Sequence, residues 1–396
     1  MEKQRPLFYD VTLRDGNQAL KNPWNPRQKE KIFLQLLKLG VQAIEVGFPG
    51  SSKMDFEACR HLASIVPPGV IIAGLARAKE RDILKVAEAL KEADRKRIHI
   101  FVSFSSFHMK NVLKKSPRDI RKMAVEAVGF ARRLLKEKRE VQFSVEHFGD
   151  CSENLSFVID SLQEVAAAGA TVINLSNTVE RSRPLKFVQM MRTVFENLPE
   201  GMTISVHCHN DLGMATATTV ESYFAGASQL ECSLNGLGER AGIASLYEVA
   251  MSLHNCGVDV PLNMSGFYET ARLLAGMSHI PVHEKSPLIG SDVFVHRSGI
   301  HQNGVSKTCG MKKGAYRAMD PSLIGRREVD CFGFTSQSGK TAIYEMIRKA
   351  GYAITIEDAL RILPAARKKA EKMGELSLEV LLNLYITESA TDPKSR

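Results

Sequence analysis

The sequence contains no pair of cysteines with the Cys-x-x-Cys spacing. Its seven cysteines are scattered along the chain and odd in number, which argues against a disulfide framework and against a zinc–thiolate site. No apolar run approaches the length of a membrane span. The N-terminal residues lead directly into a strand-like run without the pattern of a signal or transit peptide. We therefore expect a cytoplasmic protein that does not associate with membranes.

A concentrated basic patch is also missing. The chain has 53 Lys and Arg against 44 Asp and Glu, a net charge of +9, but these residues are spread out. The densest basic run, Arg132 to Arg139, alternates with leucines in a helix-like pattern, which is typical of a solvated helix face. We expect no nucleic-acid partner, and an anionic cofactor such as a nucleotide-bearing thioester fits the charge equally well.

Length and rhythm predict one large domain and one smaller one in the 396 residues. Short β-branched runs recur about every thirty residues, with helix-period segments between them, which is the length of a βα unit. The predicted strands are Phe8–Leu13, Ala43–Pro49, Val70–Ala76, Arg97–Phe104, Val141–Phe148, Ala170–Ser176, Thr203–Asn210 and Ser228–Asn235. The predicted helices include Arg27–Leu39, Lys79–Ala93, Pro117–Glu137, Leu155–Ala168, Pro184–Asn197 and Ala215–Ala225.

Eight such units predict an α/β fold, a TIM (β/α)8 barrel over residues 1–275. A doubly wound sheet gives the same alternation, but it more often opens with a glycine-rich turn after its first strand, where this chain has Arg14-Asp15-Gly16. After residue 275 the alternation of predicted strands and helices ends. Residues 276–396 predict a linker and a smaller, mainly helical appendage with helices at Lys340–Gly351, Ile356–Met373 and Ser377–Leu384.

Polar side chains end seven of the eight predicted strands, and active sites of TIM barrels lie at those carboxyl ends. These residues are Arg14, Asp15, Glu45, His99, Ser103, Ser144, Glu146, Asn174, Thr178, His207, His209 and Asn235. His207 and His209 are two apart on one predicted strand, so their imidazoles point to the same face. Together with the Asp15 carboxylate they suggest a metal site, although two isolated histidines are the commoner reading of such a pair.

Four motifs in order along the chain resemble those of the 2-isopropylmalate synthase and homocitrate synthase family. They are Leu13-Arg14-Asp15-Gly16-Asn17-Gln18 with Lys29, His207-x-His209-Asn210-Asp211, Asn235-Gly236-x-Gly238-Glu239-Arg240-Ala241-Gly242, and Ser298-Gly299-Ile300-His301-Gln302. The resemblance implies a metal-assisted Claisen-type condensation of acetyl-CoA with a 2-oxo acid. It also implies a homodimer in which His301 of the appendage reaches the neighbouring subunit's barrel.

The resemblance assigns a role to each site residue. Asp15, His207, His209 and Asn235 are the expected ligands of a divalent metal (Mn, Mg or Zn). Arg14, Glu146 and His301 are the expected catalytic residues: Arg14 for negative charge on the ketone oxygen, the other two for proton transfer. The expected 2-oxo acid contacts are Gln18, Glu45, His99, Ser144 and Thr178. The expected acetyl-CoA loop is Gly236, Gly238, Glu239 and Arg240.

Two residues depart from the family pattern: Asn177 stands where Asp is common, and Ile243 follows Gly242 where Asn is usual. Long members carry a further regulatory domain, and because this chain ends at Arg396 we expect no leucine feedback of the usual kind. The leading prediction is condensation with 3-methyl-2-oxobutanoate in leucine biosynthesis. The alternatives are another 2-oxo acid (pyruvate or 2-oxoglutarate, with Arg77 as a weakly placed cation for the latter), a related acyl-CoA lyase, or a degenerate barrel that serves as a basic binding module.

Overall fold

The computed structural model describes residues 5–135, 140–311, 313–327 and 331–390, which form two compact units, Met1–Pro281 and Val282–Arg396. Within the described ranges, no helix combines the length and the apolar character that crossing a membrane requires.

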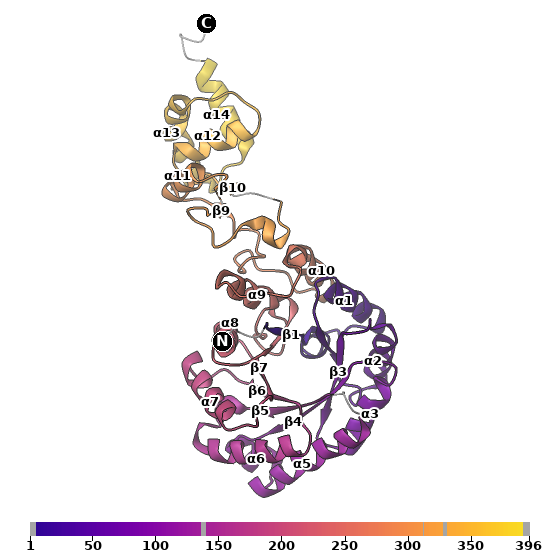
Figure 1. Ribbon diagram of the computed structural model, residues 1–396. Coiled ribbons are helices and arrows are strands. Elements are labelled where there is room, and N and C mark those ends of the chain that lie inside the picture. The colour runs from indigo at the N-terminus through magenta and orange to yellow at the C-terminus, as the bar shows by residue number, and fades with distance from the viewer. Residues whose placement is uncertain (1–4, 136–139, 312, 328–330, 391–396) are drawn as a thin grey trace. The chain divides into compact units, whose positions relative to one another are not determined.

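The first unit is a closed barrel of eight parallel strands in chain order, and Figure 1 shows helices around it. The strands are β1 (Leu7–Asp10), β2 (Ala43–Gly47), β3 (Ile71–Arg77), β4 (Lys96–Ser103), β5 (Glu140–Glu146), β6 (Val172–Asn177), β7 (Thr203–Cys208) and β8 (Gln229–Cys232). Pairing of β8 with β1, from Leu7 opposite Gln229 to Asp10 opposite Cys232, closes the barrel. The predicted (β/α)8 fold is confirmed.

Helices follow each strand and, apart from the short α4 after β4, cover the outside of the barrel. They are α1 (Pro26–Lys38), α2 (Lys53–Ile65), α3 (Glu80–Ala89), α4 (Ser106–His108), α5 (Pro117–Leu134), α6 (Leu155–Ala167), α7 (Pro184–Glu196), α8 (Ala215–Phe224), α9 (Leu246–Asn255) and α10 (Phe267–Ser278). Local signals set their ends: Asn25 and Gln28 form a capping box before α1, and Gly40 takes a positive φ of 78° after it. The end of the predicted helix Pro117–Glu137, like the end of the basic run at Arg139, lies outside the described residues.

Six of the eight predicted strands end later than the observed ones, and among these the first, seventh and eighth strands precede or contain expected metal ligands. The first stops at Asp10 because the Asp10 carboxylate accepts hydrogen bonds from the Thr12 amide and hydroxyl, and the chain turns into a π-helical segment, η1 (Thr12–Gly16). The seventh ends at Cys208, with His209 in an isolated bridge to Ile243. The eighth ends at Cys232, three residues before Asn235, which takes a left-handed φ of 56°.

The barrel interior is unusually polar. TIM barrels commonly fill it with layers of Val, Ile and Leu, but here the fully buried Arg97 donates to the side-chain oxygens of Gln142 (2.8 Å) and Gln229 (2.6 Å). Gln142 in turn donates to Glu231 at 2.6 Å. Burying these groups is tolerable because they bond to one another. The network leads from the barrel interior to the carboxyl ends of the strands.

The second unit is mainly helical, as predicted. It contains a two-stranded parallel sheet, β9 (Val295–His296) with β10 (Cys331–Phe332), and the helices α11 (Gly299–Lys307), α12 (Lys340–Lys349), α13 (Ile356–Met373) and α14 (Leu378–Ala390). Phe334, Ile343, Ile362 and Leu381 are among its fully buried core residues. Helix α11 lies where the sequence reads only as a polar stretch, because few of its residues are apolar enough to show a helical period.

The buried Asp10 makes a prediction about stability. Burial raises the pKa of Asp10 from 3.8 to about 7, against the lowering effect of its hydrogen bonds to Thr12. The folded state therefore retains a proton that the unfolded chain has lost, so this group weakens stability as pH rises through this range. Asp10→Asn removes the group that titrates. Its free energy of unfolding, relative to that of the parent, should therefore rise by about 1.4 kcal/mol per pH unit between the unfolded pKa of 3.8 and the folded pKa of about 7.

The measurement is urea unfolding of both proteins from about pH 4 to about pH 8, where the gain should level off above neutrality. Asp94→Asn, at an exposed aspartate, is the matched control. Its free energy of unfolding should differ from that of the parent by the same amount at every pH. A pH-independent offset for Asp10→Asn would contradict the shifted pKa.

Candidate active site

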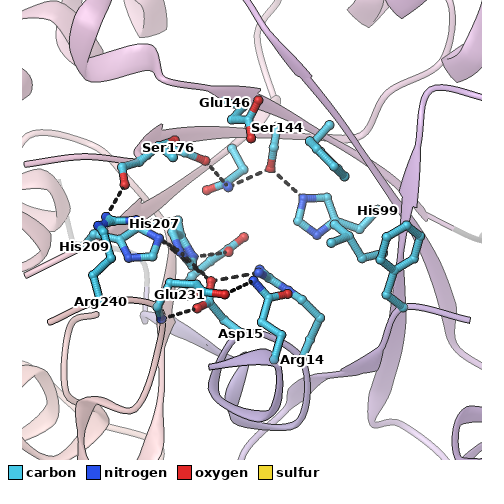
Figure 2. Close-up of a pocket in the computed structure, with 17 residues that line it drawn as sticks. Arg14, Asp15, His99, Ser144, Glu146, Ser176, His207, His209, Glu231 and Arg240 are labelled. Carbon is cyan, nitrogen blue, oxygen red and sulfur yellow. Dashed lines mark hydrogen bonds and ion pairs between the residues drawn. The ribbon is translucent and has the colours of Figure 1, made fainter. Parts of the chain in front are cut away.

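A cavity of about 320 Å³ opens at the carboxyl ends of the barrel strands, inside the first unit. It is lined by Arg14, Asp15, Gln18, Phe48, Leu75, His99, Phe101, Ser144, Glu146, Asn174, Ser176, Thr178, His207, His209, Glu231, Glu239 and Arg240. Figure 2 shows Asp15, His207 and His209 converging on one side, with Ser144 and Glu146 across from them. Most of the residues predicted from strand ends therefore surround one space.

Asp15, His207 and His209 present three donor atoms to one point. The Nε2 atoms of the two imidazoles lie 3.2 Å apart, and Asp15 Oδ2 lies 3.4 Å from His207 Nε2 and 3.9 Å from His209 Nε2. A cation about 2.1 Å from each ligand separates its ligands by roughly 3.0–3.5 Å. The three side chains are buried, and their two nitrogens and one oxygen fit a divalent transition metal.

Neighbouring groups fix the orientation of these donors. Glu231, fully buried on β8, lies 3.0 Å from His207 Nδ1, so His207 Nε2 faces the cavity. The Glu239 amide donates to Asp15 Oδ1 at 3.0 Å, which leaves Oδ2 turned toward the imidazoles. Such outer contacts set the tautomer and the direction of ligands in metal sites.

The buried charges of the cluster shift one another's pKa values strongly. Burial raises the pKa of Asp15, but Arg14 and His207 outweigh it and hold this pKa well below its ordinary range. Burial lowers the pKa of His207, but its contacts with Asp15 and Glu231 prevail and raise it to about 9. Burial, followed by the charge of His207, lowers the pKa of His209 to about 3.

The side-chain oxygen of Asn235, the remaining expected ligand, is buried and has no hydrogen-bond partner among the described residues. Asn235 does not line the cavity, and its side-chain amide donates to the Ala271 carbonyl at 3.1 Å. The left-handed backbone at Asn235 turns the chain after β8 ends. The structure brings Asp15, His207 and His209 together, and the expected role of Asn235 as a fourth ligand stays a prediction. Ile243, one of the two departures from the family pattern, lies beside this cluster through its bridge to His209.

Arg14 spans two carboxylates. Its Nε donates to Glu45 at 2.5 Å and its Nη1 to Asp15 Oδ2 at 2.8 Å, with about a tenth of the side chain exposed. Burial lowers the pKa of Arg14, but Glu45 and Asp15 outweigh this effect and raise it, so the guanidinium stays charged. The structural ion pair with Glu45 is present, and Arg14 also faces the cavity.

Glu45 lies behind the cavity wall, contrary to its expected place among the substrate contacts. It is fully buried and does not line the cavity, because Arg14, the Tyr9 hydroxyl and His99 Nδ1 surround its carboxylate. The expected contact His99 does line the cavity, and its Nε2 lies 2.5 Å from Ser144 Oγ. Ser144 also accepts from the Asn174 amide at 2.8 Å. This chain of contacts fixes the polar wall.

Glu146, beside Ser144 on β5, and Thr178 also line the cavity. Burial raises the pKa of Glu146, with His147 opposing the shift. Within the described ranges the Glu146 carboxylate accepts no hydrogen bond, whereas Thr178 Oγ1 accepts one from the His147 amide at 2.7 Å. Gln18 lies at the exposed rim, 3.4 Å from Glu239. Glu146 is thus a carboxyl group at the cavity surface that is free for proton transfer.

The glycine loop lies against Asp15. A Cβ on Gly238 would lie 3.0 Å from Asp15 Oδ1 and 2.9 Å from Ile243 Cγ2, so only glycine lets the loop approach so closely. Glu239 and Arg240 line the cavity, and Arg240 pairs with Asp211 at 2.7 Å. Gly236 does not line it and takes a positive φ of 66° in the turn. The first structural role of the loop is to hold the Asp15 carboxylate.

Some functional residues lie outside what the sequence predicted. Glu231 is the clearest case, and its signal is the alternation of Gln229 and Glu231 on a strand whose inward face is buried. Apolar cavity residues such as Phe48 and Phe101 give no such signal, because apolar strand residues usually pack in the core. His301 belongs to the second unit, where its ring stacks on Tyr316 at 4.0 Å. Its expected catalytic role stays a prediction.

Profiles of known protein families match both units of the chain. The profile of the HMGL-like family matches residues 5–274, and that of the alpha-isopropylmalate synthase post-catalytic domain-like family matches residues 291–348. 2-Isopropylmalate synthase 2 of Leptospira interrogans is 57% identical over 379 residues, 95% of this chain and 89% of that protein. 2-Isopropylmalate synthase of Pyrococcus furiosus is 37% identical over 384 residues, 95% of this chain and 75% of that protein.

Among solved structures, the HMG-CoA lyase of Bacillus subtilis superposes with a TM-score of 0.62 and covers 72% of this chain and 97% of that chain. At 18% sequence identity, this likeness supports the fold alone.

The contact between the glycine loop and Asp15 makes a prediction about metal affinity. Gly238→Ala should push the loop away from Asp15 and loosen the Glu239–Asp15 bond, which fixes the direction of the carboxylate. Loss of such an outer contact typically weakens metal affinity about 10-fold to 100-fold. Calorimetric titration of the apoprotein with Mn²⁺ or Zn²⁺ measures the change.

Gly276→Ala is the matched control, because a Cβ there meets open space on a helix without positive φ. It should bind the metal as the parent does. Equal affinity in both variants would mean that the loop does not hold Asp15 in place.

Proposed function

We propose that the chain condenses acetyl-CoA with 3-methyl-2-oxobutanoate to give 2-isopropylmalate. It belongs to the HMGL-like family, together with the 2-isopropylmalate synthases. The reaction is that of an acyltransferase in leucine biosynthesis. The observation that carries the proposal is the Asp15–His207–His209 cluster, which lies at the base of a cavity in a chain 57% identical to such a synthase.

Asp15, His207 and His209 would hold a divalent cation at this base. When bound, the cation supplies Lewis-acid polarisation of the ketone of the 2-oxo acid. The protein's own part is to keep three donors converged and buried, through Glu231 behind His207 and the Glu239 amide behind Asp15. Zinc and manganese suit the two imidazoles better than magnesium does.

Arg14 is the residue that we assign to the developing negative charge. As the carbanion of acetyl-CoA attacks the ketone carbon, the ketone oxygen becomes an alkoxide, and a fixed cation beside it lowers the barrier. Arg14 already lies at the cavity surface with its orientation set by Glu45 and Asp15. It needs no rearrangement when the charge forms, which is the physical basis of such stabilisation.

Glu146 is the group that we assign to proton transfer within the barrel. Its carboxylate would take a proton from the acetyl methyl group, directly or through a water, and burial raises its pKa, which makes it the stronger base. The alkoxide is then protonated, and hydrolysis of the thioester by water releases the CoA thiol. His301 remains a second candidate for proton transfer on the resemblance alone.

The wall of the cavity favours a branched alkyl substrate. Phe48, Leu75 and Phe101 give it an apolar side next to the polar His99. A dicarboxylate such as 2-oxoglutarate would need a further cation, and Arg77 is instead paired with Asp82 at 2.5 Å and does not line the cavity. Pyruvate is the closer competitor, because a few methylenes contribute only about 1–3 kcal/mol each to discrimination.

Assembly and location belong to the same proposal. We expect a homodimer with an exchanged appendage and a cytoplasmic enzyme, both on the family resemblance. The match of residues 291–348 to the post-catalytic domain of alpha-isopropylmalate synthases supports a synthase over a lyase.

The first test is release of free CoA thiol from acetyl-CoA by the purified chain with Mn²⁺ or Mg²⁺. It is run in parallel with 3-methyl-2-oxobutanoate, pyruvate and 2-oxoglutarate. We expect release with 3-methyl-2-oxobutanoate, loss of release after chelation, and no activity in Asp15→Asn. Release only with another acid would correct the substrate, and no release with any acid would reject the proposed reaction.

A second test separates the role of Arg14 from simple structure. A lysine ammonium cannot contact Glu45 and Asp15 with a planar fork. Arg14→Lys should lower kcat by roughly 10²–10³-fold, with a smaller change in KM, because the charge that Arg14 opposes grows in the transition state. Arg27→Lys, at an exposed position of α1, is the control. An unchanged kcat would leave Arg14 with a structural role only.

A further inference from the structure

A second group of metal-binding side chains lies where β4 and β5 end. His108, Glu146 and His147 each offer one ligand atom, and these atoms all lie within 4.8 Å of one another. None of the three belongs to the Asp15–His207–His209 cluster. We propose that this group is a separate binding site for a divalent cation of the zinc type.

The two imidazoles face each other closely. Their ring centroids are 3.7 Å apart with the planes inclined by 36°, and His108 is only half-buried while His147 is buried. His108 ends the short helix α4, whereas His147 directly follows β5, so tertiary structure alone brings them together. Two polar rings in contact gain little from packing, but they can share one cation.

His147 is oriented as a metal ligand is. Its Nδ1 lies 3.1 Å from Asp150 Oδ2, and Arg181 donates to the same oxygen at 2.9 Å. This contact leaves Nε2 of His147 as the free nitrogen, which is the carboxylate–histidine arrangement found behind metal ligands.

The backbone of His147 is held in place as well. Its φ is 58°, a left-handed conformation that is uncommon outside glycine, and its amide donates to Thr178 Oγ1 at 2.7 Å. Such conformations persist only where the surroundings fix them, and they gather at functional sites. The direction of the His147 ring is therefore imposed on both sides, by Thr178 and by Asp150.

Glu146 completes the donor set. Within the described ranges its carboxylate makes no hydrogen bond or ion pair, so nothing competes for its oxygens. Two imidazole nitrogens and one carboxylate oxygen form a typical zinc set that leaves a further position open. The single negative charge of Glu146 partly neutralises the cation.

Occupation of this site has a consequence for catalysis. A cation bound to Glu146 withdraws its carboxylate from proton transfer, so zinc would act as an inhibitor that does not displace the metal at Asp15. This consequence rests on the proposed function, whereas the binding itself does not.

The test counts zinc on the tag-free full chain. Equilibrium dialysis against Zn²⁺ followed by metal analysis should give two zinc ions per chain for the parent and one for His108→Gln. His209→Ala should also retain one, because it removes the other site. His61→Gln, at a half-exposed histidine beside Glu30 on the barrel surface, is the matched control and should keep two.

Substitution with Co²⁺ gives a second readout. The visible bands of the parent minus those of His108→Gln should show nitrogen and oxygen ligands without thiolate charge transfer, which separates the site from the exposed cysteines. Circular dichroism verifies that His108→Gln, at a half-buried position, keeps its fold. The same zinc count in His108→Gln as in the parent, or one zinc in the parent that His209→Ala abolishes, would overturn the proposal. A failed thiol-release assay would not change these counts.

Discussion

The two-pronged ion pair of Arg14 is the interaction on which the rest of the site depends. One guanidinium joins Glu45, in the middle of β2, to Asp15, in the segment after β1. Without it, two buried carboxylates would lie close together with no fixed cation, which is strongly unfavourable. With it, Asp15 stays ionised and directed at the two imidazoles, Glu45 is free to hold His99, and Arg14 itself is presented to the cavity.

The polar barrel interior supports the same site from below. The network that begins at Arg97 passes through Gln142 to Glu231, which fixes His207. An apolar interior would pack equally well, but it could not set the direction of an imidazole. The same logic explains the glycine loop, whose backbone approaches Asp15 only because Gly238 has no side chain. Stability and chemistry are thus built from the same buried hydrogen bonds.

The two departures from the family pattern have different structural settings. Asn177 is buried, and a Cβ added to Gly149 would lie only 2.3 Å from the Asn177 Oδ1. The Asn177 Nδ2 is buried and has no hydrogen-bond partner among the described residues. Ile243 lies beside the Asp15 cluster, where its methyl group contacts the glycine loop. It puts an apolar group next to the metal-binding donors.

The sequence by itself determined the number and order of the barrel units, because helical and strand periods are local properties of the chain. It also determined that Asp15, His207 and His209 meet, since parallel strands bring their carboxyl ends to one edge. Only the tertiary structure decided that Glu45 is buried behind Arg14, that the Asn235 amide donates to the Ala271 carbonyl, and that His108 meets His147. These outcomes depend on side-chain packing and on backbone turns between distant segments, and neither follows from a residue's place in a periodic pattern.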